Sequence, residues 1–498
     1  MNYTIEKVTT LIGARRYGDT DANISFVLTD SRSLCFPEET LFFALKTERN
    51  DGHNYIPELY ARGVRNFVVE VVPDKWETLY SGSNFLKVVG SLEALQRLAE
   101  RHRDEFLIPI VGITGSNGKT MVKEWLYQLL SPQMVVTRSP RSYNSQIGVP
   151  LSVWLLNENT QVGVFEAGIS KPGEMMALRD IIQPTIGVFT SLGTAHQENF
   201  PSIEAKCMEK LCLFHDTKAI VYSMDDDILT HCLAQYNYQG EQLSWSIKHT
   251  DAAFYIKSIE KKDIETTLTY TWKGGKEAQY KLPFIDDASV ENSITCAVVA
   301  LHLGVTQAAL AERMAQLEPV AMRLEVKEGQ HGCTLINDSY NSDYNSLDIA
   351  LDFMNRRPDH KGRRRTLILS DILQSGEEDK ELYNKVAFLC EKRGVDKFIG
   401  IGEGLLAERN AFKHLGEKHF FATIHAFIHS EVFANLHDEV ILLKGARQFG
   451  FDSLTELLVK KVHETVLEVN LNAVVDNLNW YRSFMKPETK LVCMIKAD

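Results

Sequence analysis

Short apolar runs alternate with amphipathic stretches through the middle of the chain. The run at 107–114 enters a glycine-rich turn, and the stretch that follows places apolar side chains at helical spacing, at Val122, Trp125, Leu126, Leu129 and Leu130. Further apolar runs at 162–165, 185–190 and 219–223 alternate with helical stretches. Because buried parallel strands read as continuous apolar runs, this pattern predicts an α/β unit with a parallel sheet covered on both sides.

Residues 1–106 read as a separate small α/β unit. A buried strand is expected at 66–72, and an amphipathic helix at 91–102 is expected to end the unit. In the central unit, for which we expect the bounds 107–315, a polar and strand-rich stretch at 251–282 precedes a closing helix near 290–303.

A third α/β unit is expected over 316–461. Its predicted strands lie at 333–337, 366–370, 397–401 and 439–443. The last segment, 462–498, begins a new pattern.

Composition narrows the class of protein. At ~150 residues per domain, 498 residues predict about three domains. Hydrophobic residues make up 44% and charged residues 24%, close to the ordinary composition of soluble proteins, so neither disorder nor a fibrous repeat is indicated. The net charge of -12 argues against a general nucleic-acid binder, although a local loop can still bind phosphate. Scattered cysteines without a Cys-x-x-Cys pair, and no apolar run of ~18 residues, predict a reduced, cytoplasmic protein without membrane insertion.

A candidate phosphate loop joins the run at 107–114 to the following helix. Its residues are Gly115, Ser116, Asn117, Gly118, Lys119 and Thr120. A glycine-rich turn that opens a helix presents backbone N–H groups to phosphate anions. Lys119 would reach the β- and γ-phosphates of ATP, and Thr120 would bind Mg²⁺. The strict P-loop pattern has glycine where this chain has Ile113, but Gly-Lys-Thr after a strand favours a nucleotide site over a turn without a ligand.

The segment 112–120 resembles the ATP loop of the Mur ligases, cytoplasmic enzymes that build the peptidoglycan stem peptide. The resemblance implies a three-domain α/β fold: a UDP-binding N-terminal domain, a central P-loop domain with a parallel sheet, and a Rossmann-like C-terminal domain. Glu166, which ends the run 164–166, matches the family's acidic Mg²⁺ ligand. A carboxylate at the carboxyl end of a strand beside a phosphate loop suits a cation that bridges phosphates.

Two further positions match the family's second metal site. His196 matches a histidine that helps to hold a second Mg²⁺, and Lys210 follows at the family's spacing of fourteen residues. The family lysine is carbamylated by CO₂ and so becomes an anionic metal ligand. Lys206 is the competing candidate, but it stands at a different spacing. The resemblance therefore implies Lys119, His196 and Lys210 as catalytic residues. The implied metal ligands are Thr120, Glu166, His196 and carbamylated Lys210.

Other motifs resemble the family's adenosine site. Asp338-Ser339-Tyr340-Asn341 is similar to the Asp-x-Tyr-Asn segment whose aspartate meets the ribose of ATP. Arg323 matches an arginine that precedes this segment, and Asn292 matches an asparagine near the adenine. The implied ATP contacts outside the loop are Asn292, Arg323, Asp338, Tyr340 and Asn341. The turn 444–447 resembles the family's Lys-Gly-Ser-Arg turn, but an ordinary strand-ending turn explains it equally well.

The substrate motifs favour the MurF type, which adds D-alanyl-D-alanine to UDP-N-acetylmuramoyl-tripeptide through an acyl phosphate. The segment 29–32 is similar to the UDP site, with Ser31 and Arg32 as contacts, and 144–150 and 123–124 look like the MurF type. The implied substrate contacts are Ser31, Arg32, Asn144 and Ser145. The chain departs from the family pattern at Thr47, Ser142, Ala288, Ser289 and 341–344.

The segments 465–473, 477–478 and 491–498 are similar to the opening of an alanine racemase, in which the lysine matching Lys496 carries pyridoxal phosphate. We therefore expect the chain to be a fragment of a longer ligase–racemase fusion, whose ligase part is monomeric and whose racemase part is dimeric. A short C-terminal extension is the alternative.

Three other functions fit parts of the pattern. Another Mur-like amide ligase, of the folate polyglutamating or cyanophycin type, would share the loop but not the segment 30–32. A silent nucleotide-binding scaffold would not need Glu166, His196 and Lys210 together. A kinase would use the loop but leaves the lysine fourteen residues after His196 without a role.

Overall fold

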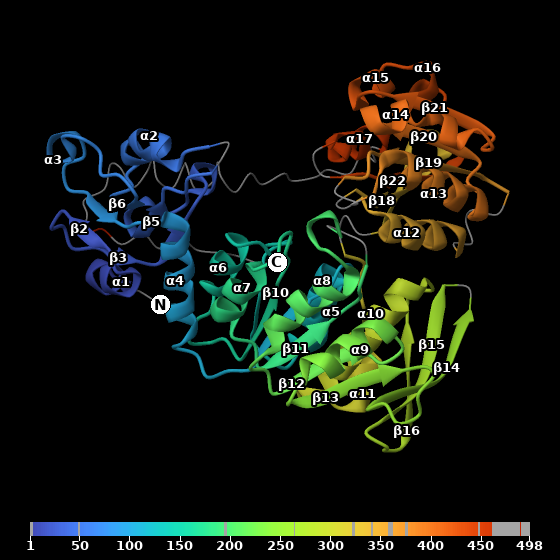
Figure 1. Ribbon diagram of the computed structural model, residues 1–498, viewed down its shortest axis with the longest axis horizontal. Helices are drawn as coiled ribbons and strands as arrows, with labels where there is room; N and C mark the ends of the chain where they lie inside the picture. The colour runs from blue at the N-terminus through green and yellow to red at the C-terminus, as the bar shows by residue number, and fades with distance from the viewer. Residues whose placement is uncertain are drawn as a thin grey trace. The chain divides into compact units, whose positions relative to one another are not determined.

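The computed structural model describes residues 3–47, 50–193, 197–262, 264–320, 324–339, 342–356, 362–373, 377–446, 449–460 and 489. The chain divides into two compact units, the first ending at His102 and the second beginning at Arg103. The second unit contains two separate sheets. Figure 1 labels the helices and strands.

The first unit is built on a five-stranded sheet with the order β2-β7-β6-β5-β4. The strands β4, β5, β6 and β7 are parallel, and β2 is antiparallel to β7. Their bounds are β2 Arg15–Tyr17, β4 Phe26–Leu28, β5 Thr40–Phe43, β6 Asn66–Val69 and β7 Asn84–Lys87. A small pair, β1 Tyr3–Thr4 and β3 Asn23–Ile24, lies outside this sheet. The helices are α1 Ile5–Ile12, α2 Ile56–Ala61, α3 Trp76–Leu79 and α4 Ser91–Arg103.

The larger sheet of the second unit has nine strands in the order β16-β15-β14-β13-β12-β11-β8-β10-β9. The strands from β9 to β14 in this order are parallel, whereas β14, β15 and β16 form an antiparallel extension. Their bounds are β8 Ile110–Thr114, β9 Val136–Arg138, β10 Val162–Glu166, β11 Ile186–Phe189, β12 Ala219–Ser223, β13 Glu241–Ser246, β14 Phe254–Lys262, β15 Glu265–Trp272 and β16 Glu277–Leu282.

Seven helices accompany this sheet in the described residues, and their core explains the sequence pattern. They are α5 Lys119–Leu130, α6 Gly148–Val153, α7 Glu174–Ile182, α8 Ile203–Leu211, α9 Asp227–Tyr236, α10 Asp287–His302 and α11 Gln307–Met314. The apolar face of α5, with Val122 and Trp125, packs in one hydrophobic core with Val290 and Ile294 of α10. The predicted amphipathic helix after the phosphate loop is therefore confirmed.

The third sheet has six strands in the order β17-β18-β22-β19-β20-β21, all parallel except β17. Leu367 and Leu369 of β19 belong to one hydrophobic core, and the intervening Ile368 belongs to another. Because neighbouring side chains of a strand point to opposite faces, both faces of this sheet are covered. The strands are β17 Glu325–Glu328, β18 Thr334–Asp338, β19 Arg364–Ser370, β20 Lys397–Ile401, β21 Glu417–Phe421 and β22 Glu439–Lys444. The helices are α12 Tyr344–Arg356, α13 Asp379–Lys392, α14 Glu403–Ala407, α15 Ile424–Ile428, α16 Glu431–Ala434 and α17 Phe451–Leu458.

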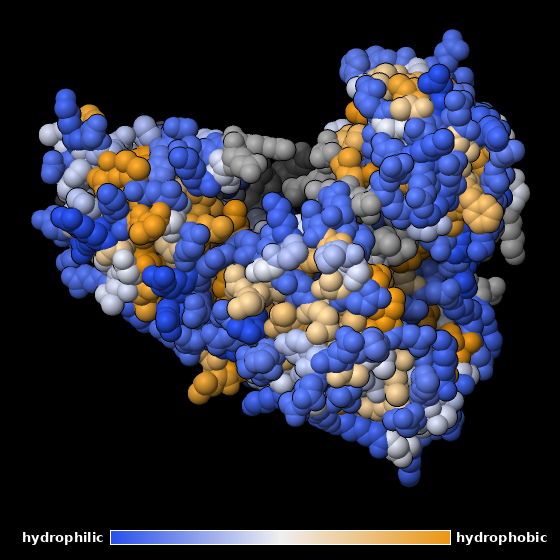
Figure 2. Space-filling model, in the orientation of Figure 1, coloured by the Kyte–Doolittle hydropathy of each residue, from blue (hydrophilic) through white to orange (hydrophobic). Residues whose placement is uncertain are grey.

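The face of the protein drawn in Figure 2 is mostly hydrophilic, with hydrophobic residues in small groups. Fully exposed apolar side chains include Val89 and Leu107. Within the described ranges, no helix combines the length and apolarity needed to cross a membrane.

Candidate active site

The candidate phosphate loop lies between β8 and α5, and β8 itself lies between β10 and β11. Gly118 has a positive φ of 84°, which an L side chain rarely adopts. A Cβ atom at this position would lie 2.4 Å from Asn292 Oδ1 of α10. The loop therefore needs glycine at position 118, and the structure brings the predicted adenine contact Asn292 to the loop.

The segment that follows β11 fixes the loop through hydrogen bonds. The Ser116 N–H donates to the Ser191 carbonyl oxygen at 2.7 Å, and the Asn117 N–H donates to Ser191 Oγ at 3.3 Å. Ser116 Oγ also accepts from the Gly193 N–H at 2.9 Å. These contacts hold the turn in one conformation, as binding a phosphate with little reorganisation requires.

Lys119 folds back over the loop that it closes. Its Nζ donates to the carbonyl oxygens of Gly115, at 2.7 Å, and Ser116, at 3.1 Å. The side chain is only half-buried. Its ammonium group is therefore beside the turn in which phosphates would bind, and a change of rotamer would move it from carbonyl oxygens to phosphate oxygens.

Thr120 and Glu166 lie side by side, as a shared cation requires. Thr120 Oγ1 donates to Glu166 Oε2 at 3.2 Å, and Asn144 Nδ2 donates to the same oxygen at 3.4 Å. Within the described part of the chain, no group of three or more His, Cys, Asp or Glu side chains is arranged to hold a metal. A single carboxylate with a hydroxyl suits Mg²⁺, which keeps several waters and takes its other ligands from substrate phosphates.

Lys210 reaches the loop from α8. Its Nζ donates to the Gly115 carbonyl oxygen at 3.2 Å, and the residue is 4% exposed. Burial, together with the nearby Lys119 and Lys206 cations, lowers the pKa of Lys210 well below its ordinary value. Carbamylation by CO₂ requires a neutral amine, so this environment fits the modification that the family resemblance implies.

Lys206, the competing candidate, is also buried. Its Nζ donates to the Gly193 carbonyl oxygen, and burial lowers its pKa to about 8. Both lysines therefore have lowered pKa values, and the contact with Gly115 distinguishes Lys210 as the one beside the phosphate loop.

In the third sheet, Asp338 is held by a lysine from the neighbouring strand. Asp338 ends β18 and Lys444 ends β22, and the two residues are paired in the parallel register. Lys444 Nζ lies 2.7 Å from Asp338 Oδ2, and the side chains are 0% and 8% exposed. The sequence alone does not distinguish the turn that begins at Lys444 from an ordinary strand-ending turn, because the acidic partner of Lys444 lies 106 residues away in the chain.

The predicted substrate contacts are divided between the two compact units. Ser31 and Arg32 follow β4 in the first unit, where Arg32 Nη2 lies 2.6 Å from Asp30 Oδ2. This hydrogen bond lowers the pKa of Asp30. Asn144 and Ser145 belong to the second unit, where Asn144 contacts Glu166.

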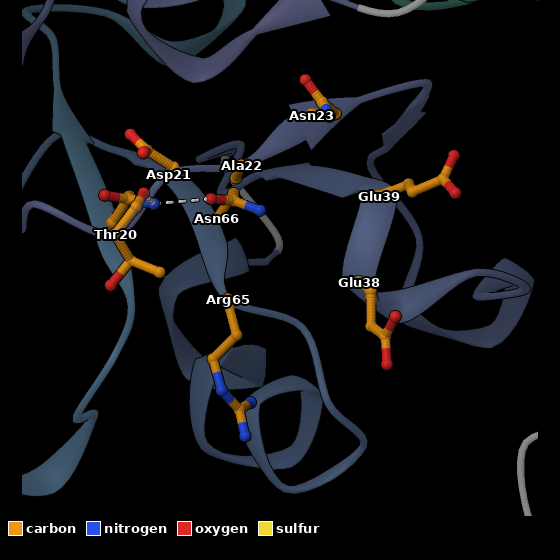
Figure 3. Close-up of a pocket in the computed structure, with 9 residues that line it drawn as sticks. Thr20, Asp21, Ala22, Asn23, Glu38, Glu39, Arg65 and Asn66 are labelled. Carbon is orange, nitrogen blue, oxygen red and sulfur yellow. Dashed lines mark hydrogen bonds between the residues drawn. The ribbon is translucent and has the colours of Figure 1, made fainter. Parts of the chain in front are cut away.

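The first unit also contains a pocket of about 320 Å³ that the sequence did not indicate (Figure 3). Asn66 begins β6 and Asn84 begins β7, so the pocket lies at the amino ends of the parallel strands. Asn84 Nδ2 donates to Asn66 Oδ1 at 2.8 Å within it. Ser31 and Arg32 follow the carboxyl end of β4, so they lie at the other end of the parallel strands from the pocket. The pocket lining is Thr20, Asp21, Ala22, Asn23, Glu38, Glu39, Arg65, Asn66 and Asn84.

Five predicted site residues lie outside the described residues: His196, Arg323, Tyr340, Asn341 and Lys496. The same holds for the racemase-like segment 462–498 apart from Thr489.

Comparison with known proteins follows the same division of the chain. The family described as "Mur ligase family, catalytic domain" matches residues 23–103, and "Mur ligase middle domain" matches residues 113–300. Together these matches cover more than half of the chain. The chain is 27% identical over 393 residues to the UDP-N-acetylmuramoyl-tripeptide--D-alanyl-D-alanine ligase of Bacillus subtilis (strain 168), covering 78% of this chain and 82% of the relative.

Solved structures share the fold. MurF from Acinetobacter baumannii has a TM-score of 0.78 at 21% identity, covering 92% of this chain and 99% of that one. MurF ligase from Thermotoga maritima, in complex with ADP, has a TM-score of 0.71 at 22% identity, covering 86% and 96%. The expected three-domain α/β fold is therefore confirmed, and the chain belongs to the Mur ligase family.

Proposed function

We propose that this Mur ligase uses ATP to join D-alanyl-D-alanine to UDP-N-acetylmuramoyl-tripeptide in peptidoglycan precursor synthesis. The single observation that carries the proposal is the convergence of Lys119, Thr120, Glu166 and Lys210 on one glycine-rich loop. The similarity to the Bacillus subtilis ligase of that name supports the choice of substrates.

The proposed reaction has two steps, because a carboxylate is a poor electrophile. The terminal carboxylate oxygen of the tripeptide attacks the γ-phosphorus of ATP, and the bond from that phosphorus to the bridging oxygen breaks, which gives an acyl phosphate and ADP. The amine of the dipeptide then attacks the acyl carbon. Phosphate leaves with the bonding electrons and the amine loses a proton, so the products are the amide, ADP and phosphate.

The chain's own residues position the reactants and offset charge. Lys119 would exchange its hydrogen bonds to Gly115 and Ser116 for hydrogen bonds to phosphate oxygens. There its positive charge would stabilise the negative charge that develops during phosphoryl transfer. Mg²⁺ bound by Thr120 and Glu166 would neutralise charge on the β- and γ-phosphates. Asp338, held by Lys444, would accept hydrogen bonds from the ribose hydroxyls. Lys210 would enter the site as a carbamate, with an anionic oxygen.

Phosphate release tests the proposal. We expect purified chain to release phosphate only when ATP, Mg²⁺, UDP-N-acetylmuramoyl-tripeptide and D-alanyl-D-alanine are all present, with omission of any one returning the rate to background. A kinase would transfer the phosphoryl group without the dipeptide, and a silent scaffold would release none. Turnover that persists with an amino acid in place of the dipeptide would instead indicate another amide ligase. Release that is independent of the dipeptide contradicts the assignment.

We also propose that residues 462–498 belong to an alanine racemase domain, which would supply D-alanine for the dipeptide. The proposal rests on the sequence resemblance of this segment, including Lys496 as the pyridoxal phosphate lysine. A gene product that carries this segment within a complete racemase domain, supplied with pyridoxal phosphate, is expected to convert L-alanine to D-alanine, and its Lys496→Ala variant is expected not to. If that product forms no D-alanine, the racemase assignment of this segment is wrong.

A further inference from the structure

A lysine that the mechanism does not yet use lies at the centre of the site. Lys123 is one helical turn after Lys119 on α5, and its side chain is completely buried. Buried lysines are rare unless they are paired, so its neighbours should show what it does.

The Lys123 ammonium group balances the buried carboxylate of Glu166. Its Nζ lies 3.2 Å from Glu166 Oε1, and both side chains are 0% exposed. Oε1 accepts no hydrogen bond within the described residues. The other oxygen, Oε2, contacts Thr120 and Asn144. The two carboxylate oxygens thus have different partners: one faces a fixed cation, and the other faces the residues of the predicted Mg²⁺ and substrate sites.

Two further contacts of Lys123 fix the segment that approaches Glu166 after β9. Its Nζ donates to the carbonyl oxygens of Ser139, at 2.9 Å, and Arg141. Ser139 Oγ in turn accepts from the Glu166 N–H at 3.2 Å. Next along the segment, Ser142 Oγ lies 3.2 Å from Thr120 Oγ1. One ammonium group therefore joins the phosphate-loop helix, the end of β10 and the segment 139–144.

We propose that Lys123 is a positioning residue that holds Glu166 with Oε2 turned towards Thr120, so that the carboxylate is oriented to bind Mg²⁺ with the nucleotide. This inference rests on the proposed function. Removing a residue that orients a metal ligand typically weakens metal binding by about 10- to 100-fold.

Glu124 provides a matched control, because it is the other acidic partner of Lys123. Lys123 Nζ lies 2.9 Å from Glu124 Oε1, and Glu124 also pairs with Arg138 at 3.0 Å. Its side chain is 20% exposed, and its carboxylate pairs with Lys123 and Arg138, not with Glu166. A Glu124→Gln change loosens the anchoring of Lys123 on its outer side and leaves the Lys123–Glu166 pair in place.

The first test measures binding of a non-hydrolysable ATP analogue to the full chain by calorimetry, with and without MgCl₂. Without Mg²⁺, we expect Lys123→Met to bind the analogue with an affinity within about twofold of the unmodified protein. The gain in affinity on addition of Mg²⁺ should be about tenfold smaller in the variant. Glu124→Gln should retain both values. If Lys123→Met retains the full Mg²⁺ effect, or if Glu124→Gln loses as much of it, the positioning role is refuted.

A second test covers the case in which Lys123→Met is too unstable to purify. Removing one partner of a buried ion pair leaves an uncompensated charge, whereas removing both charges does not. We therefore expect Lys123→Met/Glu166→Gln to have a higher Tm than Lys123→Met alone. A double variant that is no more stable than the single variant would show that the bonds to Ser139 and Arg141, and not Glu166, are what Lys123 provides.

Neither measurement uses the tripeptide or the dipeptide. If the dipeptide proves not to be the acceptor, the proposed function fails while the Mg²⁺ comparison between Lys123→Met and Glu124→Gln remains decisive for this inference.

Discussion

Replacement of Lys119 by alanine is expected to lower kcat by about 10³-fold or more while the protein remains folded. The side chain is only half-buried, and its two hydrogen bonds are made to carbonyl oxygens of its own loop. The fold therefore depends little on it, whereas the transferring phosphoryl group would lose its nearest cation. The measurement is phosphate release under saturating substrates, with circular dichroism as the check on folding.

A surface lysine of the same unit provides the control for this variant. Lys276 is exposed between β15 and β16, in the antiparallel extension of the nine-stranded sheet. Lys276→Ala should retain full turnover. If Lys119→Ala also turns over at the rate of the unmodified protein, the loop does not act on the reacting phosphate.

Lys210→Ala should lower kcat by about 10²-fold or more, and short carboxylic acids such as formate or acetate should restore part of the activity. A carbamate presents a carboxylate-like group, so a small acid can occupy the space left by the shortened side chain. Lys210 approaches the loop at Gly115 and is 4% exposed, and the truncation leaves a cavity of suitable position. Full activity of the variant without any added acid would refute a role for Lys210 in metal binding.

Lys206→Ala separates the two candidate lysines. Lys206 donates to the Gly193 carbonyl oxygen, and Gly193 also contacts Ser116 of the loop. Loss of this lysine should disturb the loop through Gly193, and no carboxylic acid should restore the activity. Rescue of Lys206→Ala, and not of Lys210→Ala, would show that Lys206 is the carbamylated residue in spite of its different spacing from His196.

The sequence predicted the elements that have a strong local signal. The run at 219–223 and the stretch at 397–401 coincide with β12 and β20. The segment 251–282 contains β14, β15 and β16, as its polar and strand-rich character suggested. Each of these predictions depends only on neighbouring residues.

The roles of Lys123 and Lys444 could not be predicted, because both depend on which strands become neighbours. Lys123 is buried only because β10 lies next to β8 and brings Glu166 to α5. Lys444 finds Asp338 because β22 lies beside β18, a pairing across more than one hundred residues. A lysine in an amphipathic or strand-ending segment is otherwise expected at the surface, where most lysines lie.

The central place of β8 in its sheet has a consequence for how the protein is made. Both neighbours of β8, β10 and β11, follow it in the chain, and the apolar face of α5 is covered by α10. In addition, Trp125 of α5 donates to the Glu318 carbonyl oxygen at 3.0 Å. During synthesis, the phosphate loop and the start of α5 therefore emerge from the ribosome about 170 residues before α10. The apolar face of α5 stays exposed until α10 has been made and can pack against it.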